Sequence, residues 1–313
     1  MIGAVAFVCN VCGRQNSTPN FATEPASCPC GSNVRVRALI HLLSLELFGH
    51  SMVLADFPVM KSIRGLGMTD KACYADVLAN KFDYKNTHYD REPRLDFTQR
   101  HPELYGQFDF ILSGDVLEHV AGPVERTLEE AFSLLNARGI FGITVYCNPA
   151  DSLQEHFPEL NDYRLVQLGE QPVLINRRRD GTLEIKEDLI FHGGPGATLE
   201  MREFGITGLQ SKLREAGFRG FEILTANVPE FGIIFDSDVS QPLLARKEPF
   251  VLTRPMAAEL VQRWQEFRDQ SARAWEERDQ SARALEDVER RMRVAAESKW
   301  VRLGKRLGLG PEL

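Results

Sequence analysis

Short apolar runs that end in polar turns alternate with amphipathic segments along most of the chain. In the clearest case, residues 108–112 form an apolar run that passes through Ser113-Gly114-Asp115 into residues 116–120. This order is typical of a strand end, a turn and a helix start. Strands that alternate with helices predict an α/β fold with a doubly wound, largely parallel sheet, in which ligands bind beyond the carboxyl ends of the strands.

The same patterns predict the other elements of this fold. Strands are expected at residues 52–55, 63–70, 84–89 and 139–145, helices at 36–48, 71–81 and 207–216, and a closing hairpin at 221–224 with 232–235. Glycines follow two of the helices, at Gly49 and Gly217, where helices commonly end. Residues 151–205 interrupt the alternation with short strand-like runs, which indicates a cap inserted into a domain spanning residues 35–250.

Several motifs in the middle of the chain resemble one known family. These are Leu95-Asp96-Phe97-Thr98, the strand 108–112, the segment Leu117-Glu118-His119-Val120, and the glycine-led strand 139–145. In this order they resemble class I S-adenosylmethionine-dependent methyltransferases of the type 11-like group, over about residues 53–235. The resemblance implies a Rossmann-like doubly wound sheet, S-adenosyl-L-methionine as cofactor, and methyl transfer.

The predicted first strand departs from the family pattern. The family has a glycine-rich loop there, because a chain without side chains lets the backbone approach the cofactor. This chain has Asp56, Phe57 and Pro58 instead. Either an altered loop holds the cofactor, with polar contacts from Asp56 or Ser62, or the cofactor site is degenerate; we favour the first.

The resemblance implies further cofactor contacts. Asp70, at the end of the expected second strand, would accept hydrogen bonds from the ribose hydroxyls, although it also suits the N-cap of helix 71–81. Asp96 would bind the adenine amino group, and Phe97 would pack on the adenine face. Ser113 and Asp115 follow the next strand and belong to the same expected site.

Five residues are candidates for the side of the site that binds the methyl acceptor. His119 lies where the family places the transferred methyl group, so it is a candidate general base, or else it orients the loop. Tyr146 and Asn148 follow the strand 139–145 and could line an acceptor pocket. His192 and Arg202 could contact the acceptor, or serve as loop and pairing residues.

Four cysteines in residues 1–34 have the spacing of metal ligands. Cys9 and Cys12 form one pair, and Cys28 and Cys30 form a second. Four thiolates from two tight turns suit a structural, tetrahedral Zn²⁺, because no coordination position is left for a substrate. The alternative is a pair of loops that carry free thiols.

The carboxy-terminal residues 255–303 have a different composition. Apolar and small residues recur there in alternating steps of four and three, which predicts a helical, coiled-coil-like arm that self-associates, or else a single solvated helix. The arm ends in a tail, residues 304–313. A basic and apolar segment at 299–307 overlaps the start of this tail and could contact an anionic membrane surface or an acidic partner, or dock on its own helix.

Charge and composition narrow the functional classes. The chain has 313 residues, a net charge of −7 and 43% hydrophobic residues, so we expect a globular, cytoplasmic protein that does not bind nucleic acid. The first hypothesis is a methyltransferase acting on a hydroxyl of a small molecule or saccharide, as in glycan biosynthesis. The alternatives are a catalytically inactive, methyltransferase-like scaffold and a zinc-ribbon nucleic-acid methyltransferase.

Overall fold

The computed structural model describes residues 5–18, 27–148, 152–192, 198–235 and 241–296. The chain divides into two compact units, Met1–Ala257 and Ala258–Leu313.

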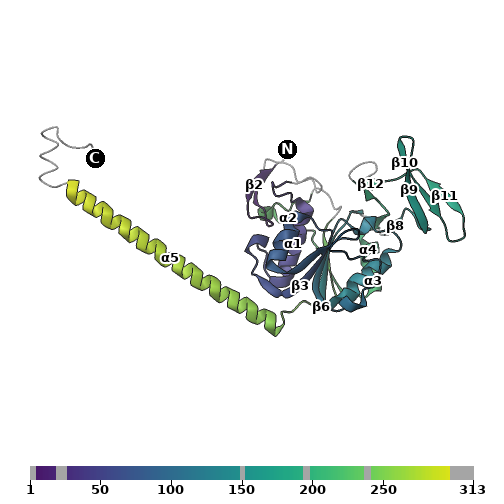
Figure 1. The fold of residues 1–313 in the computed structure, drawn as a ribbon. Coiled ribbons are helices and arrows are strands. Elements are labelled where there is room, and N and C mark those ends of the chain that lie inside the picture. The colour runs from purple at the N-terminus through teal and green to yellow at the C-terminus, as the bar shows by residue number, and fades with distance from the viewer. Residues whose placement is uncertain (1–4, 19–26, 149–151, 193–197, 236–240, 297–313) are drawn as a thin grey trace. The chain divides into compact units, whose positions relative to one another are not determined.

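A six-stranded sheet forms the centre of the first unit, with the strand order β15-β16-β6-β5-β3-β4 (Figure 1). Its strands are β3 (Met60–Met68), β4 (Phe82–Thr87), β5 (Phe108–Gly114), β6 (Leu135–Thr144), β15 (Gly220–Ile223) and β16 (Leu243–Arg246). The strands β4, β3, β5 and β6 are parallel, whereas β16 is antiparallel to both of its neighbours. The predicted α/β sheet with central parallel strands is confirmed.

Helices cover both faces of this sheet (Figure 1). They are α1 (Val34–Phe48), α2 (Ala72–Lys81), α3 (Val124–Leu134) and α4 (Ile206–Ala216). Buried side chains of α3 and α4 share one core cluster with Ile111 and Phe141 of the sheet. On the other face, the ring of Phe110 fills the space beside Gly65, where a Cβ atom would lie 2.2 Å from it. That close approach explains why β3 carries a glycine there.

The predicted strand at residues 52–55 was wrong. Leu54–Asp56 form a short 3₁₀ helix, η1, and the first strand of the sheet is β3. Leu54 is buried, and Phe57 packs edge-on against Phe48 of α1 with ring centroids 5.1 Å apart. An apolar run this short can be buried as a strand or as a turn of helix, so its pattern does not distinguish the two.

The closing hairpin also differs from the prediction. β15 pairs with β16, whereas residues 232–235 contribute only an isolated bridge between Val228 and Ile233. β16 was missed because its buried run, Leu243–Ala245, is short and leads directly into charged residues and prolines.

Small sheets make up the predicted cap and the amino-terminal segment. β9 (Asp162–Leu168), β10 (Gln171–Arg177) and β11 (Leu183–Lys186) form one antiparallel sheet that projects from the α/β body (Figure 1). The short strands β7 (Cys147–Asn148), β8 (Gln154–Glu155), β12 (Phe191–His192), β13 (Thr198–Leu199) and β14 (Arg202–Gly205) connect it to the body. The hairpin of β1 (Val5–Val8) and β2 (Gln15–Thr18) precedes α1.

One long helix, α5 (Arg254–Ala296), begins at the end of the first unit, and its residues 258–296 form the described part of the second unit. Large apolar side chains on it are exposed, including Trp264, Phe267 and Leu285. Among the described helices, none combines the length and the apolar character needed to cross a membrane. The predicted contacts of residues 299–313 lie outside the described residues.

Candidate functional site at the carboxyl edge of the sheet

Four parallel strands place their carboxyl ends, and the segments that follow, at one edge of the sheet. Two residues at this edge have left-handed backbone conformations although they are not glycine: Thr69 after β3, with φ 59°, and Asp115 after β5, with φ 58°. Such conformations cost free energy and are concentrated at functional sites. This edge of the sheet is therefore the candidate functional site.

Asp70 is buried after β3, in a network with β4. Tyr84 donates a hydrogen bond of 2.5 Å to Asp70 Oδ2, and Asn86 exchanges two bonds of 2.8 Å with the Asp70 main chain. Burial raises the pKa of Asp70 to about 7, although the hydrogen bonds from Tyr84 and Tyr74 oppose that shift. At neutral pH this carboxyl group is therefore poised between its two protonation states.

Two predictions about Asp70 need correction. The residue follows the first strand of the sheet, not the second, because the strand expected at residues 52–55 is absent. The N-cap of α2 is Lys71, and no side chain caps the helix. The ribose contact predicted for Asp70 was derived from a second-strand position that this residue does not occupy.

Asp115 is held in place by α1 and β6. Arg35 Nη1 lies 3.1 Å from Asp115 Oδ1, and the Thr144 hydroxyl donates a bond of 2.9 Å to the same oxygen. The side chain of Arg35 is buried, so this ion pair is shielded from water. The sequence reasoning missed Arg35 as a site residue; the pair Arg35 and Arg37 at the start of a largely apolar helix was the available signal.

Glu118 is the second residue of the site that sequence reasoning missed. It lies in the 3₁₀ helix η3 (Leu117–His119), is 1% exposed, and neither carboxylate oxygen has a hydrogen-bond partner among the described residues. Burial, and then the nearby negative charge of Asp115, raise the pKa of Glu118 to about 8. Asp70, Asp115 and Glu118 thus make this edge rich in carboxyl groups.

The structure brings His119 and His192 together from distant segments. Their rings meet edge to face, with centroids 4.7 Å apart. His119 Nδ1 lies 2.9 Å from the Leu199 carbonyl oxygen, which can only accept, so Nδ1 carries the proton and Nε2 keeps a lone pair. Burial lowers the pKa of His119, which favours this neutral form.

Of the two roles expected for Arg202, contact with the acceptor or pairing within the protein, the structure shows the pairing. Its side chain is 1% exposed and pairs with Glu155 at 2.8 Å. It also donates to the carbonyl oxygens of Leu117 and Val120, both at 2.7 Å, and to that of Gly122. The guanidinium group therefore holds the η3 loop, and its donors are used within the protein.

The other predicted acceptor residues lie near β6 and β7. Tyr146 directly follows β6 and is 38% exposed. Asn148 is the last residue of β7, but its side chain is outside the described part of the chain.

Asp96 lies beyond β4 with its carboxylate oriented. Its Oδ1 accepts bonds from the Thr98 amide at 2.9 Å and from the Thr98 hydroxyl at 2.7 Å. Phe97, in contrast, is 5% exposed and belongs to the main core cluster, which corrects its predicted role on the adenine face. Ser113 is fully buried within β5.

The altered loop predicted to hold the cofactor lies at the opposite edge of the sheet. Asp56, Phe57 and Pro58 precede Met60, where β3 begins, and the nine residues of that strand span roughly 30 Å. This placement corrects their predicted role, because the other site residues follow the carboxyl ends of the strands. Phe57 is instead part of the core.

The four amino-terminal cysteines form a compact cluster. Cys9 and Cys30 have sulfur atoms 3.8 Å apart, and those of Cys12 and Cys28 are 3.6 Å apart. Ligands at the usual Zn–S distance of about 2.3 Å in a tetrahedron are separated by about 3.8 Å. All four sulfur atoms lie within 4.8 Å of one another, close to this spacing, so the cluster could hold a tetrahedral metal ion.

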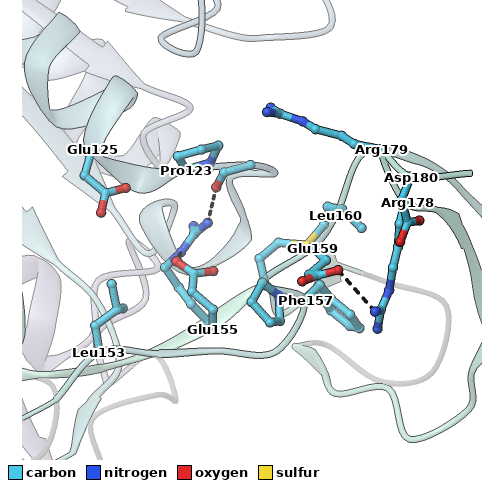
Figure 2. A pocket seen from close by; sticks show the side chains of 14 residues that line it. Pro123, Glu125, Leu153, Glu155, Phe157, Glu159, Leu160, Arg178, Arg179 and Asp180 are labelled. Carbon is cyan, nitrogen blue, oxygen red and sulfur yellow. Dashed lines mark hydrogen bonds and ion pairs between the residues drawn. The ribbon is translucent and has the colours of Figure 1, made fainter. Parts of the chain in front are cut away.

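A pocket of about 580 Å³ lies between the start of α3 and the cap (Figure 2). Charged residues line much of it, and Arg178 pairs with Glu159 at 3.1 Å across one side. Phe157 and Leu160 supply apolar surface. No sequence pattern predicted this pocket, because its lining comes from four separate segments.

No protein-family model matches this chain, and no curated protein matches its sequence. Three similar solved structures are the CMeT domain of the citrinin polyketide synthase, the CurJ carbon methyltransferase, and the Burkholderia thailandensis 1,6-didemethyltoxoflavin-N1-methyltransferase with bound S-adenosylhomocysteine.

Their sequence identities to this chain are 11%, 12% and 15%, and the TM-scores are 0.40, 0.36 and 0.33. The matches cover 72%, 62% and 75% of this chain, and 55%, 51% and 96% of the other chains, so this chain spans about half of the first two. Because these values describe a distant likeness, the activity has to be inferred from the residues of this chain.

Proposed function

We propose that this protein is an S-adenosyl-L-methionine-dependent methyltransferase that acts on a hydroxyl group of a sugar, a glycan or another small molecule. The observation that carries the proposal is the gathering of Asp70, Asp115 and Glu118 at the carboxyl edge of parallel strands. Two of these carboxyl groups have raised pKa values of about 7 and 8, which is typical of functional sites.

The chemistry of this edge suits the cofactor. Bound S-adenosylmethionine supplies a methyl group activated by a positively charged sulfur. A bound sulfonium would favour the ionised forms of Asp70 and Glu118, and these carboxylates would then stabilise its positive charge. The oriented carboxylate of Asp96 can accept hydrogen bonds from an amino group or a hydroxyl. Asp115 belongs to the same proposed binding region, whereas the side chain of Ser113 is fully buried and does not contribute to it.

The acceptor would enter from the side of η3 and the cap. His119 offers the lone pair of Nε2 to a hydroxyl proton, because Nδ1 is engaged with Leu199. Tyr146, Asn148 and His192 are proposed to line the approach. The charged pocket of Figure 2 adjoins the η3 loop through Arg202 and fits a polar acceptor such as a saccharide.

We further propose that Cys9, Cys12, Cys28 and Cys30 hold a structural Zn²⁺. The cluster provides four thiolates and no position for a substrate. The metal would supply folding free energy to an amino-terminal segment with little core of its own.

Calorimetric titration with S-adenosylmethionine and with S-adenosylhomocysteine tests the cofactor assignment. We expect the wild type to bind both, and Asp96→Ala to bind each at least about tenfold more weakly, since a hydrogen bond to a charged group contributes about 1.5–3 kcal/mol. Asp56→Ala is the matched control, because it removes an exposed carboxylate at the opposite edge of the sheet.

Two results would contradict the proposal. If Asp96→Ala binds both compounds with wild-type affinity, Asp96 is not part of the cofactor site. Failure of the wild type to bind either compound at millimolar concentration would favour the scaffold hypothesis. That hypothesis has its own support, because the amides of Thr69 and Asp70 after β3 are already bonded within the protein.

A further inference from the structure

Glu118, His119 and His192 bring three metal-ligating groups together beside the proposed methyl-transfer site. One carboxylate oxygen and one ring nitrogen from each histidine lie within 4.8 Å of one another. An ion with ligand distances of about 2.0–2.2 Å holds its ligands about 3–4 Å apart. The cluster is therefore close to the spacing that coordination requires.

Glu118 gives an independent indication of a ligand. Its side chain is buried, and neither carboxylate oxygen has a hydrogen-bond partner of normal geometry within the described residues, although the backbone amides of Glu118 and Tyr146 lie near enough to oppose the rise of its pKa. A buried polar group without a partner is costly, and native proteins usually pair it with a hydrogen-bond donor or a metal ion. A cation at this position would supply the missing partner.

The surrounding residues hold both histidine rings by one nitrogen, as is usual for histidines that ligate a metal ion. His119 Nδ1 donates to the Leu199 carbonyl oxygen at 2.9 Å, which leaves Nε2 available. His192 Nε2 lies 2.5 Å from Glu200 Oε2, which leaves Nδ1 available, and His156 binds the other oxygen of Glu200 at 2.8 Å. Ligating histidines typically give their second nitrogen to a carboxylate or a carbonyl in this way.

We infer that Glu118, His119 and His192 bind a divalent cation of the class that mixed imidazole and carboxylate ligands select, such as Mn²⁺, Fe²⁺, Co²⁺ or Zn²⁺. Three protein ligands leave coordination positions open. With its Nε2 on the cation, His119 would not act as the general base described above. The acceptor hydroxyl would instead become more acidic by binding the cation and would release its proton to solvent. This use rests on the proposed function, whereas cation binding does not.

Titration of the full chain with Mn²⁺ tests the site, with free Mn²⁺ followed by electron paramagnetic resonance. The chain is first loaded with one equivalent of Zn²⁺, so that the thiolate cluster is filled. We expect one Mn²⁺ to bind per chain, and Glu118→Gln and His192→Ala each to weaken binding at least about tenfold. Glu187→Gln and His50→Ala, at exposed positions, should bind Mn²⁺ as the wild type does.

The outcomes separate this inference from the proposed function. A wild type that binds no Mn²⁺, or variants with wild-type affinity, would overturn the cation site. If Glu118→Gln does not fold, the partly exposed His192 still provides the test. If the chain binds Mn²⁺ but not S-adenosylmethionine, the cation site is supported and the methyltransferase proposal is contradicted. If it binds S-adenosylmethionine but not Mn²⁺, only the cation site is contradicted.

Discussion

Asp70 is the residue at which burial has its clearest effect on charge. The folded protein holds the proton of this carboxyl group up to about pH 7, whereas the unfolded chain releases it near the ordinary value of 3.8. Between these pH values the folded state binds more protons, so this group makes the free energy of unfolding fall as the pH rises. The loss is complete above about pH 7.

Asp70→Asn should remove this pH dependence. From pH 4 to pH 8 the wild type should lose on the order of 2–4 kcal/mol of unfolding free energy that the variant does not lose. Urea unfolding at both pH values measures the difference. Asp83→Asn, at an exposed position in β4, should show little change, and an equal response in the two variants would argue against a buried proton on Asp70.

Among the elements, α5 has large apolar side chains that are exposed to solvent in the described part of the chain. Val261, Trp264, Phe267, Trp275, Leu285, Val288 and Met292 are more than half exposed. Most of them follow the alternating spacing predicted for a pairing seam, whose middle is polar at Ser271, Arg278 and Ser281. We propose that a second copy of the chain covers this seam, with weak affinity because of its polar middle.

Light scattering during gel filtration tests this self-association. The wild type should exceed the monomer mass of 35.3 kDa at high concentration and approach that mass on dilution. The double change Leu285→Ser and Val288→Ser should shift the protein towards the monomer, because it removes apolar area from the seam. Glu286→Ser should not. A wild type that stays monomeric at every concentration would favour a single solvated helix.

At the scale of the whole molecule, Arg37 connects the cysteine cluster to the α/β body. Its buried guanidinium group donates to the Ser32 carbonyl at 3.2 Å, to the Ser27 hydroxyl at 2.9 Å and to the Gly232 carbonyl at 2.8 Å. It also lies over the ring of Phe7, 4.7 Å from its centroid. Loss of the metal should therefore affect more than the amino-terminal segment.

Cys12→Ser should lower the thermal unfolding midpoint by on the order of 5–10 °C, and a zinc chelator should do the same to the wild type. Metal analysis should show the loss of one zinc per chain in the variant. Cys73→Ser, outside the cluster, is the matched control and should keep both its zinc and its midpoint. Equal midpoints in the two variants would argue for free thiols.

Several features could be predicted from local sequence because their causes are local. Alternating buried strands and amphipathic helices indicated the α/β class, and α1 and α4 end at Gly49 and Gly217, whose left-handed φ angles of 68° and 113° favour glycine. The cysteine pairs lie on two tight turns, so their spacing already predicted a cluster.

Other features depend on contacts between distant segments, so no local pattern could reveal them. The order of the strands placed Asp56 and Pro58 at the wrong edge of the sheet for the predicted site. The burial of Phe97, Glu118 and Arg202 depends on packing across the fold, and His119 meets His192 only because the cap returns to η3. Local sequence thus accounts for the elements and their ends, whereas the environment of each site residue arises from long-range packing, which sets its exposure, its charge and its neighbours.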